Sequence, residues 1–315
     1  MAYKTPLPDA LHDVAFTVAE ARQLGVRRGR LAGGDLHRPF RGIRSWAVPA
    51  DIVDLCKAYL PKLGVNQRFS HVTAAHLLEI PVQWNLVRPG ALHITTVGGD
   101  AASGKGITGH RAHKADAPHI VHDLPVMSPT QTFFDLATVS GHKWIVVAGD
   151  ALVGGTNPLC AIEQLTDALR QRAGTRGSAR ARKALERVRL CVDSPMETLL
   201  RLLLVDAGLA EPIVNRRYWS AGGLYLGKAD LSYPQWRITI EYEGDQHRTD
   251  PAQFSQDIRR YARFGSAEWE VIRVEKSGLL EHPGEVLQVV RATIETQQRR
   301  IAKGFIRPEP SRHAA

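Results

Sequence analysis

The sequence predicts a multidomain protein of the α/β (α+β) class. A chain of 315 residues is longer than a single hydrophobic core usually supports. Its composition, 43% hydrophobic and 23% charged, excludes a disordered chain and a fibrous repeat. Helical patterns with apolar residues three or four apart alternate with short β-branched runs. These observations predict three domains, over residues 1–60, 66–169 and 191–305.

Charge is distributed unevenly along the chain. The formal net charge is +9, from 41 Lys and Arg against 32 Asp and Glu. Residues 191–315 hold 17 basic and 17 acidic residues, so the whole surplus precedes them. It lies in residues 1–44, with 8 basic and 4 acidic, and in residues 170–189, with 8 basic and 1 acidic. A polyanion is the partner that such patches favour, although charge alone does not name it.

Residues 1–60 contain the parts of a winged helix-turn-helix. Thr17 can cap a helix Val18–Leu24, and a second, arginine-rich helix Arg27–Ala32 follows Gly25. A basic ribbon, Leu36–Ser45, comes next, and the second helix can enter a major groove. An ordinary helical hairpin with solvated arginines is the alternative. The side chains expected to contact DNA are Arg27, Arg28, Arg30, Arg41 and Arg44.

Residues 66–169 are expected to form a second α/β domain. Helices are predicted at Val72–Leu78, Pro129–Val139 and Pro158–Arg170, and strands at Leu92–Val97 and His119–His122. The following residues 170–190 are rich in Arg, Ala and Gly. They form either a solvated linker or a basic helix that clamps the phosphate backbone, in which case the contacts come from Arg180, Arg182 and Lys183.

Two ligand motifs in the second domain are incomplete. The stretch 99–106 is similar to a phosphate loop, but Gly106 replaces the hydroxyl that would bind magnesium, so a flexible hairpin is expected. Two HxxH pairs lack a helix that would bring each pair onto one face, and we expect no metal there. These pairs are His110 with His113 and His119 with His122.

Cysteine spacing and hydropathy indicate the compartment. Cys56, Cys160 and Cys191 lie far apart without a CxxC pair, which argues against disulfides and a zinc site. No apolar run approaches the roughly 20 residues that a membrane span needs. We therefore expect a cytoplasmic protein without a membrane partner.

The third domain, residues 191–305, predicts the order α-β-β-β-α-β-α, a mixed central sheet flanked by helices. Its first helix begins at Ser194-Pro195, with Glu197 at the third position of a capping box. A disordered tail, residues 306–315, ends the chain. The strands are predicted at Pro212–Tyr218, Leu226–Tyr233, Arg237–Glu243 and Glu270–Val274, and the later helices at Pro251–Phe264 and Gly284–Lys303.

Carboxylates gather on two neighbouring strands of this domain. Glu241 and Glu243 share one face of their strand, as Lys228 and Asp230 share a face of the preceding one. If the strands pair through the turn at Pro234-Gln235, Asp230 lies near Glu241. Clustered carboxylates repel one another unless a cation lies among them. Oxygen ligands without cysteine favour Mg²⁺ or Mn²⁺.

Ordered motifs in residues 191–290 resemble those of a PD-(D/E)XK endonuclease domain, in the branch related to very-short-patch mismatch-repair endonucleases. The motifs are Ser194-Pro195-Met196-Glu197, Lys228-Ala229-Asp230-Leu231, Ile240-Glu241-Tyr242-Glu243-Gly244-Asp245-Gln246-His247, a helix with Asp257 and Arg260, and Trp269 with Val271-Ile272-Arg273-Val274. Residues 16–150 resemble AbiEi-type antitoxins of type IV toxin–antitoxin systems, through Ser70-His71-Val72-Thr73-Ala74-Ala75 and Ser128-Pro129-Thr130-Gln131-Thr132.

The first resemblance implies a restriction-endonuclease-like core with a catalytic Mg²⁺ or Mn²⁺. Asp230, Glu241 and the backbone carbonyl of Tyr242 would bind the ion, and Glu197 would complete the acidic set unless it only caps its helix. Gln246 and His247 would orient water or phosphate. The implied activity is hydrolysis of DNA phosphodiester bonds, in defence or repair.

One position departs from the family pattern. Glu243 stands where most members carry lysine, and Lys228, on the face of Asp230, is the candidate replacement. The alternative is a non-catalytic DNA-binding regulator, an antitoxin-like repressor with an inactive nuclease fold. A homodimer would allow double-strand cleavage, and a cognate toxin would be a partner of an antitoxin-like region.

Overall fold

The computed structural model describes residues 5–244 and 251–309, with the backbone alone for residues 251–255. The chain forms two compact units. Unit 1 comprises Met1–Leu152 and Leu159–Val188, and unit 2 comprises Val153–Pro158 and Arg189–Ala315. The predicted boundary near residue 190 agrees with this division. Residues 1–60 and 66–169, expected as two domains, belong to one unit.

The N-terminal part of unit 1 has one of the two helices expected there. Helix α1, Val18–Gln23, begins at Thr17, whose hydroxyl accepts a hydrogen bond from the Glu20 amide at 3.0 Å. The second predicted helix is wrong, because only a 3₁₀ turn, Arg30–Ala32, forms. Gly29, within the predicted segment, contributes to this, since an interior glycine destabilises a helix by about 1 kcal/mol. Two short antiparallel strands, β1 (Phe16–Thr17) and β2 (Ile43–Arg44), pack over a small apolar core.

The main sheet of unit 1 has the order β5-β4-β3-β7-β6. The strand predicted at Leu92–Val97 forms as β4, whereas the sequence predicted no strand where β3, β5 and β7 lie. β4 and β5 run parallel, so the loop 99–106 is a crossover and the expected hairpin is wrong. The strands are β3 (Gln67–Phe69), β4 (Leu92–Val97), β5 (Ile107–Ala112), β6 (His119–Val121) and β7 (Leu124–Val126).

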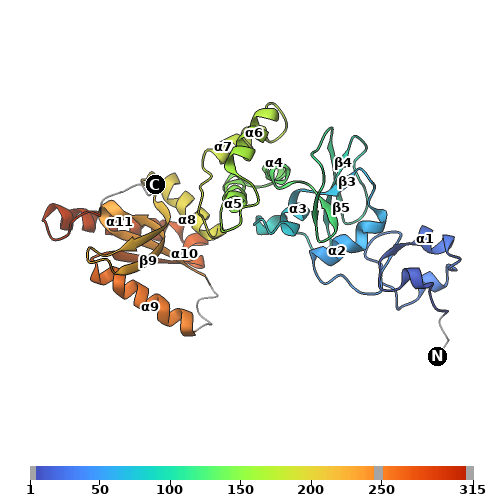
Figure 1. The fold of residues 1–315 in the computed structure, drawn as a ribbon, viewed down its shortest axis with the longest axis horizontal. Coiled ribbons are helices and arrows are strands. Elements are labelled where there is room, and N and C mark those ends of the chain that lie inside the picture. The colour runs from blue at the N-terminus through green and yellow to red at the C-terminus, as the bar shows by residue number, and fades with distance from the viewer. Residues whose placement is uncertain (1–4, 245–250, 310–315) are drawn as a thin grey trace. The chain divides into compact units, whose positions relative to one another are not determined.

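Helix α3 packs against β4 of this sheet, and α4 packs against α3 (Figure 1). The helices predicted at residues 72–78 and 129–139 are confirmed as α3 and α4. The predicted helix Pro158–Arg170 begins later, at Ile162, and α5 was not predicted. The helices of unit 1 beyond α1 are α2 (Ile52–Tyr59), α3 (His71–Leu77), α4 (Pro129–Val139), α5 (His142–Val153), α6 (Ile162–Gln171) and α7 (Ser178–Leu185).

The basic stretch 170–190 is largely part of unit 1, not a linker. Its helix α7 packs against α4, and Ala181 and Ala184 are fully buried. The Arg180 guanidinium donates a hydrogen bond to the backbone oxygen of Ser140. The stretch is therefore helical in part, with Arg180, Arg182 and Lys183 exposed, and their contact with the phosphate backbone stays a prediction.

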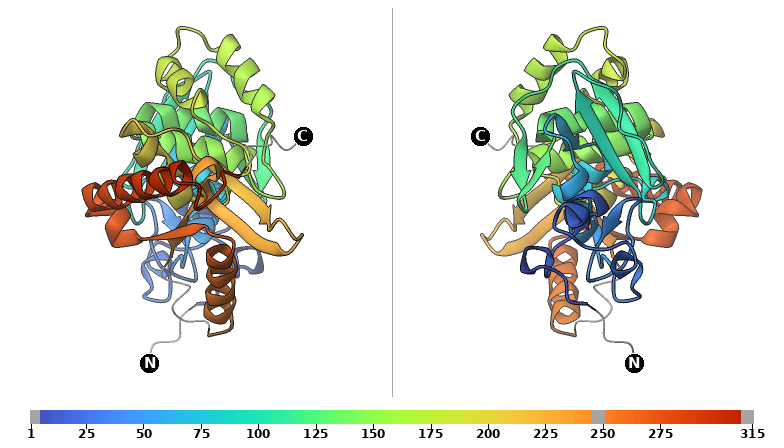
Figure 2. Two further views of the ribbon diagram at one scale, coloured as in Figure 1. Left: turned by 90° about the vertical axis from the view of Figure 1, so that its left-hand side faces the viewer. Right: turned by 90° about the vertical axis from the view of Figure 1, so that its right-hand side faces the viewer.

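Unit 2 has the predicted element order, with one added short helix, α10. The sheet order is β11-β10-β9-β8, in which β10 pairs parallel with β11 and antiparallel with β9. In Figure 1, α9 runs below this sheet and α11 above it, and the left-hand view of Figure 2 shows these elements from a second side. The elements are α8 (Pro195–Asp206), β8 (Ile213–Trp219), β9 (Tyr225–Tyr233), β10 (Ile238–Glu243), α9 (Pro251–Ser266), β11 (Glu270–Glu275), α10 (Lys276–Leu280) and α11 (Pro283–Ala302).

The first residues of the predicted disordered tail are ordered. Ile306 is buried, and the Glu309 amide donates a hydrogen bond to the Pro234 oxygen at 3.2 Å. Glu309 also forms an ion pair with Arg237 at 3.8 Å. Apolar burial and a charge pair thus hold residues 306–309, while residues 310–315 lie outside the described residues.

Two further expectations concern the whole chain. All three cysteines are free, Cys56 and Cys160 buried and Cys191 exposed, as their spacing predicted. Within residues 5–244 and 251–309, no helix combines the length and the apolar character that a bilayer crossing requires.

Candidate functional site

The turn after β9 brings Asp230 and Glu241 together. The antiparallel register pairs Tyr233 with Ile238 and Leu231 with Ile240, and one further step sets Asp230 opposite Glu241. The Tyr242 amide donates to Asp230 Oδ2 at 2.9 Å. This juxtaposition was predicted from the turn at Pro234-Gln235, and it is confirmed.

Glu197 joins this pair from the first turn of α8. Ser194 caps the helix, accepting from the Glu197 amide at 3.2 Å. The Glu197 carboxylate accepts from the Asp193 amide at 3.1 Å and from Asn215 Nδ2 at 2.6 Å. Burial and the charge of Asp230 raise the pKa of Glu197 to about 7. Glu197 therefore has a local role at the helix start and also lies within the field of Asp230.

The acidic cluster, defined as Glu197, Asp230 and Glu241, is electrostatically unfavourable as a set of three anions. Glu197 and Glu241 expose 6% and 1% of their surface. Burial, followed by the charge of Glu241, raises the pKa of Asp230, and burial raises the pKa of Glu241. A divalent cation lowers the free energy of such a cluster, and its donor atoms are the carboxylate oxygens that Mg²⁺ and Mn²⁺ prefer. The donor atoms are therefore of the type that this ion prefers, although the carboxylate oxygens of the three residues do not all lie within 4.8 Å of one another.

A guanidinium already balances part of this charge. Arg260, on α9, forms ion pairs with Glu241 Oε2 at 2.9 Å and Asp257 Oδ1 at 3.1 Å. It also donates to the Lys228 oxygen at 3.0 Å. Gly227 makes room for it, because a Cβ there would lie 2.8 Å from Arg260 Cγ. Arg260 is thus the cation closest to Glu241 among the contacts described for it.

Two other predicted residues have partners outside the cluster. Lys228 Nζ forms an ion pair with Asp193, although its charge also lowers the pKa of Asp230. Glu243 binds Arg273 through both carboxylate oxygens, one contact being 2.6 Å. Glu243 is therefore held by β11, and the structure does not bring it into the acidic cluster. Gln246 and His247 lie outside the described residues.

Residues without a sequence prediction orient the cluster. Asn215, on β8, holds Glu197, and the Thr239 hydroxyl donates to Glu241 Oε1. Asn215 has a positive φ of 51°, a conformation that asparagine tolerates better than most residues. The i, i+2 spacing of Thr239 and Glu241 is visible in the sequence, whereas nothing in it links Asn215 to Glu197.

The predicted DNA-binding arginines fall into two groups. Arg30 pairs with Asp35 at 2.8 Å, and Arg44 donates to the Leu31 oxygen at 2.7 Å. Both side chains thus make contacts within the N-terminal fold, and their contact with DNA stays a prediction. The exposed members of the predicted set are Arg27, Arg28, Arg41, Arg180, Arg182 and Lys183.

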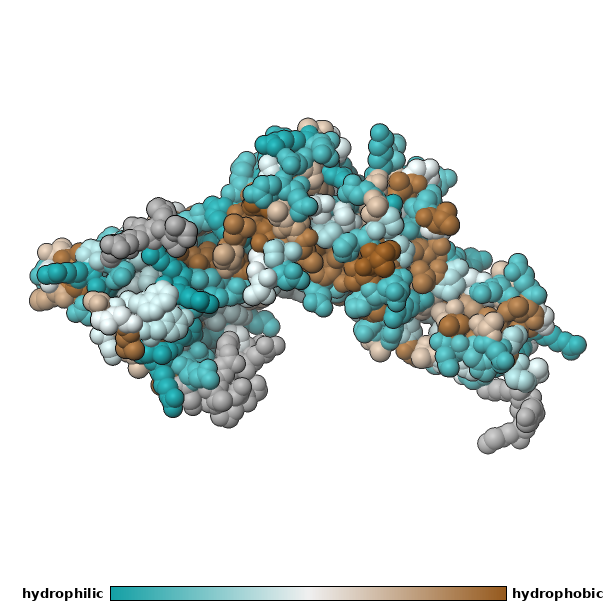
Figure 3. All heavy atoms as spheres, viewed as in Figure 1, coloured by the Kyte–Doolittle hydropathy of each residue, from teal (hydrophilic) through white to brown (hydrophobic). Residues whose placement is uncertain are grey.

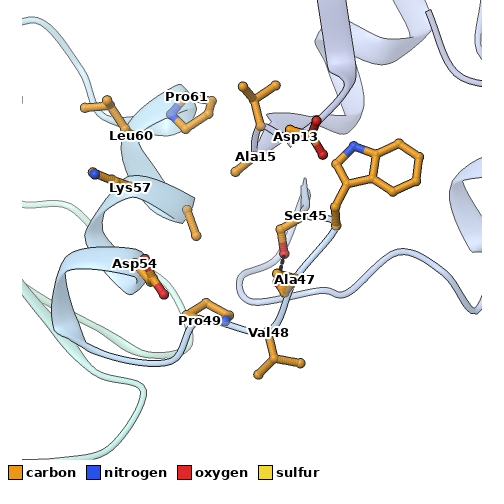
Figure 4. A pocket seen from close by; sticks show the side chains of 13 residues that line it. Asp13, Ala15, Ser45, Ala47, Val48, Pro49, Asp54, Lys57, Leu60 and Pro61 are labelled. Carbon is orange, nitrogen blue, oxygen red and sulfur yellow. Dashed lines mark hydrogen bonds between the residues drawn. The ribbon is translucent and has the colours of Figure 1, made fainter. Parts of the chain in front are cut away.

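A cavity of about 620 Å³ lies beside α2 in unit 1. Figure 4 shows its wall, with Lys57 and Asp54 on α2 and Ala47, Val48 and Pro49 opposite. Apolar and small side chains form much of this wall. On the face drawn in Figure 3, brown apolar residues likewise gather over unit 1, whereas unit 2 is mostly teal.

No protein-family model matches this chain. It is similar to two uncharacterized proteins of Mycobacterium tuberculosis, from strains CDC 1551 / Oshkosh and ATCC 25618 / H37Rv. Each is 27% identical over 127 residues, which cover 40% of this chain and 46% of the relative. The match thus spans less than half the length of the curated relatives.

Proposed function

We propose that this protein is a metal-dependent DNA endonuclease that hydrolyses phosphodiester bonds. The observation that carries the proposal is the acidic cluster, in which β9, β10 and α8 each contribute a buried or partly buried carboxylate. Protein folding alone does not favour three such groups together, because burial and mutual repulsion both raise their free energy. Function is the reason that explains them best.

Asp230 and Glu241 would hold Mg²⁺ or Mn²⁺, with the Tyr242 carbonyl as a further ligand and Glu197 binding directly or through water. Such an ion supplies Lewis-acid polarisation of the scissile phosphate and acidifies a bound water. The Tyr242 amide and Asn215 orient two of the carboxylates. Lys228 and Arg260 offer positive charge to the phosphate.

The architecture of unit 2 supports the same proposal. A mixed four-stranded sheet flanked by helices, with acids at neighbouring positions of two strands, agrees with the endonuclease core that the sequence resemblance implies. DNA would be bound through the exposed basic residues of unit 1. We propose that the enzyme works in the cytoplasm, and that double-strand cleavage requires a homodimer or two successive nicks. Defence or repair is the proposed role.

The nuclease proposal is tested by incubating the purified chain with supercoiled, linear and mismatched DNA, with Mg²⁺, Mn²⁺ or EDTA. We expect nicked or linear product only with a divalent ion. Absence of product with every substrate and both ions would contradict the proposal.

The side chains of Lys228 and Arg260 are two candidates for the role of the missing motif lysine, and variants of each residue distinguish between them. Lys228→Ala is expected to lower the cleavage rate by about 10- to 100-fold if Lys228 offsets transition-state charge. Arg260→Lys keeps a charge near Glu241 and should be milder than Arg260→Met. Single-turnover rates at saturating DNA measure both, and an undiminished rate for Lys228→Ala with a loss for Arg260→Met would assign the role to Arg260.

The exposed arginines of the N-terminal part predict a salt-dependent loss of DNA affinity. In the triple variant Arg27→Ala, Arg28→Ala, Arg41→Ala, the slope of log affinity against log salt should fall by about 2 to 3, since each phosphate contact contributes about 0.9. Fluorescence anisotropy at several salt concentrations measures it. The double variant Arg299→Ala, Lys303→Ala, on α11 and at its C-cap, removes charge elsewhere and should leave the slope almost unchanged. An equal loss in both variants would contradict the assignment.

A non-catalytic DNA-binding regulator is the second candidate. The observation that favours it is the arrangement of charge around β10, where Glu243 occupies the position of the family lysine and Arg260 already neutralises Glu241. Such a regulator would bind DNA without metal-dependent product and, like an antitoxin, could bind a cognate toxin.

A further inference from the structure

Three histidines from different parts of unit 1 meet at one point. His71 is the first residue of α3, His93 lies on β4 and His110 lies on β5. The parallel register pairs His93 with Thr108, so His110, two residues further, shares its face of the sheet. One ring nitrogen from each of the three histidines lies within 4.8 Å of the other two.

The spacing of these nitrogens is close to that of a metal site. His93 Nδ1 and His110 Nε2 are 3.0 Å apart. Two imidazole nitrogens on a tetrahedral zinc ion, each at roughly 2.0–2.1 Å from it, are roughly 3.3 Å apart. The rings of His71 and His110 stack with centroids 3.5 Å apart, so a rotation of one ring is needed before both lone pairs meet at an ion.

A carboxylate lies behind one of the histidines. Asp135, on α4, is buried, and its Oδ2 lies 3.6 Å from His71 Nδ1 and has no hydrogen-bond partner. Its Oδ1 accepts from Gln131 Nε2 at 2.7 Å. Metal-binding histidines commonly donate their second ring N–H to such a carboxylate, which leaves Nε2 as the ligand. Ser70 Oγ, 3.1 Å from the same Nδ1, is the competing partner.

Two further observations agree with a ligand-binding role. His71 has a φ of 50°, an unfavourable conformation for a residue with a Cβ, and such conformations gather at functional sites. A cavity of about 640 Å³, lined in part by Thr73 and Arg88, reaches one of the three histidines, His93. The buried nitrogen His76 Nε2, on the same wall, lacks a hydrogen-bond partner.

Two arginines lie near the three rings, Arg176 by His71 and His110 and Arg88 by His93. Their positive charge disfavours a bare divalent ion, so the ion would be accompanied by an anionic fourth ligand, such as hydroxide or a phosphate oxygen.

We propose that His71, His93 and His110 bind one divalent transition-metal ion, with Zn²⁺ as the best match, and that Asp135 orients His71. This site is separate in ligand type from the acidic cluster, because imidazole favours Zn²⁺ and carboxylate favours Mg²⁺. The proposal does not depend on nuclease activity.

Zinc binding to the EDTA-treated full chain tests the site. Titration calorimetry in excess Mg²⁺, which occupies carboxylate sites, should give one Zn²⁺ per chain. His110→Gln should weaken this binding at least 100-fold. The matched control His113→Gln, an exposed histidine three residues away, and Cys191→Ser, which removes the exposed thiol, should both leave it unchanged.

X-ray absorption of the zinc-loaded wild type gives a readout that does not depend on a variant folding. Three imidazole ligands are expected, whereas a sulfur ligand or fewer than two imidazoles would overturn the proposal. Equal zinc affinity in the wild type and a folded His110→Gln protein, judged by circular dichroism, would also overturn it. The three histidines would then be a stacked, hydrogen-bonded part of the core.

Discussion

Asp230→Asn is expected to reduce metal-dependent DNA cleavage at least about 100-fold, equivalent to about 2.7 kcal/mol of transition-state stabilisation. The amide has nearly the shape of the carboxylate, so the Tyr242 amide retains an oxygen acceptor. The negative charge that would hold Mg²⁺ is lost, and with it the polarisation of the phosphate. Conversion of supercoiled to nicked plasmid, followed over time at fixed Mg²⁺, measures the rate.

The matched control is Glu281→Gln, an exposed carboxylate after α10 in the same unit. It should cleave at the wild-type rate, while Glu241→Gln should resemble Asp230→Asn. If Asp230→Asn is folded and retains more than about a third of the wild-type rate, the acidic cluster is not the catalytic centre. If neither Asp230→Asn nor the wild type cleaves DNA, but both bind it, a non-catalytic DNA-binding regulator is the better description of this protein.

Mg²⁺ is expected to stabilise the wild type more at pH 8.5 than at pH 6. The folded-state pKa of Glu197, about 7, lies above its ordinary value of 4.5, because burial and Asp230 disfavour the charged form. The stability that the protonated group contributes is therefore present below about pH 4.5 and is lost as the pH rises through about 7. Binding of Mg²⁺ to the ionised acidic cluster should restore this folding stability. The increase in stability depends on the Mg²⁺ concentration relative to its Kd.

Differential scanning calorimetry at both pH values, with EDTA or with Mg²⁺, measures this gain as a shift in Tm. Asp230→Asn should lose most of the Mg²⁺-dependent shift, and Glu281→Gln should keep it. A shift that is equal at both pH values in the wild type would show that the ion does not bind the ionised acidic cluster.

The elements of unit 2 were predictable because their signals are local. Ser194 caps α8 within its own turn, and the short turn at Pro234-Gln235 sets the register that brings Asp230 to Glu241. In unit 1, α5 escaped prediction because most of its side chains are buried, so that its apolar residues form no stripe of helical period. The second N-terminal helix was predicted between Gly25 and the Gly33-Gly34 pair, but Gly29 within it disfavours a helix, and only a 3₁₀ turn forms.

Local sequence patterns could not predict the side chains that contact the site from distant positions in the chain. Arg260 reaches Glu241 across 19 positions of sequence, and Asn215 reaches Glu197 across 18. The HxxH spacing drew attention to His110 together with His113, whereas the fold joins His110 to His71 and His93. Packing between elements that no short turn connects selects these neighbours, and it leaves no signal in residue spacing.

The sequence by itself determined the order of elements in unit 2, the pairing of the Asp230 and Glu241 strands, and the location of excess positive charge before residue 190. These depend on hydrophobic period, turn chemistry and composition, which act over a few residues. Only the tertiary structure decided that Arg260 neutralises Glu241, that Arg273 holds Glu243, and that three histidines converge in unit 1. The reason is physical: such contacts form between side chains distant in sequence, and their geometry exists only after the sheets and helices have packed.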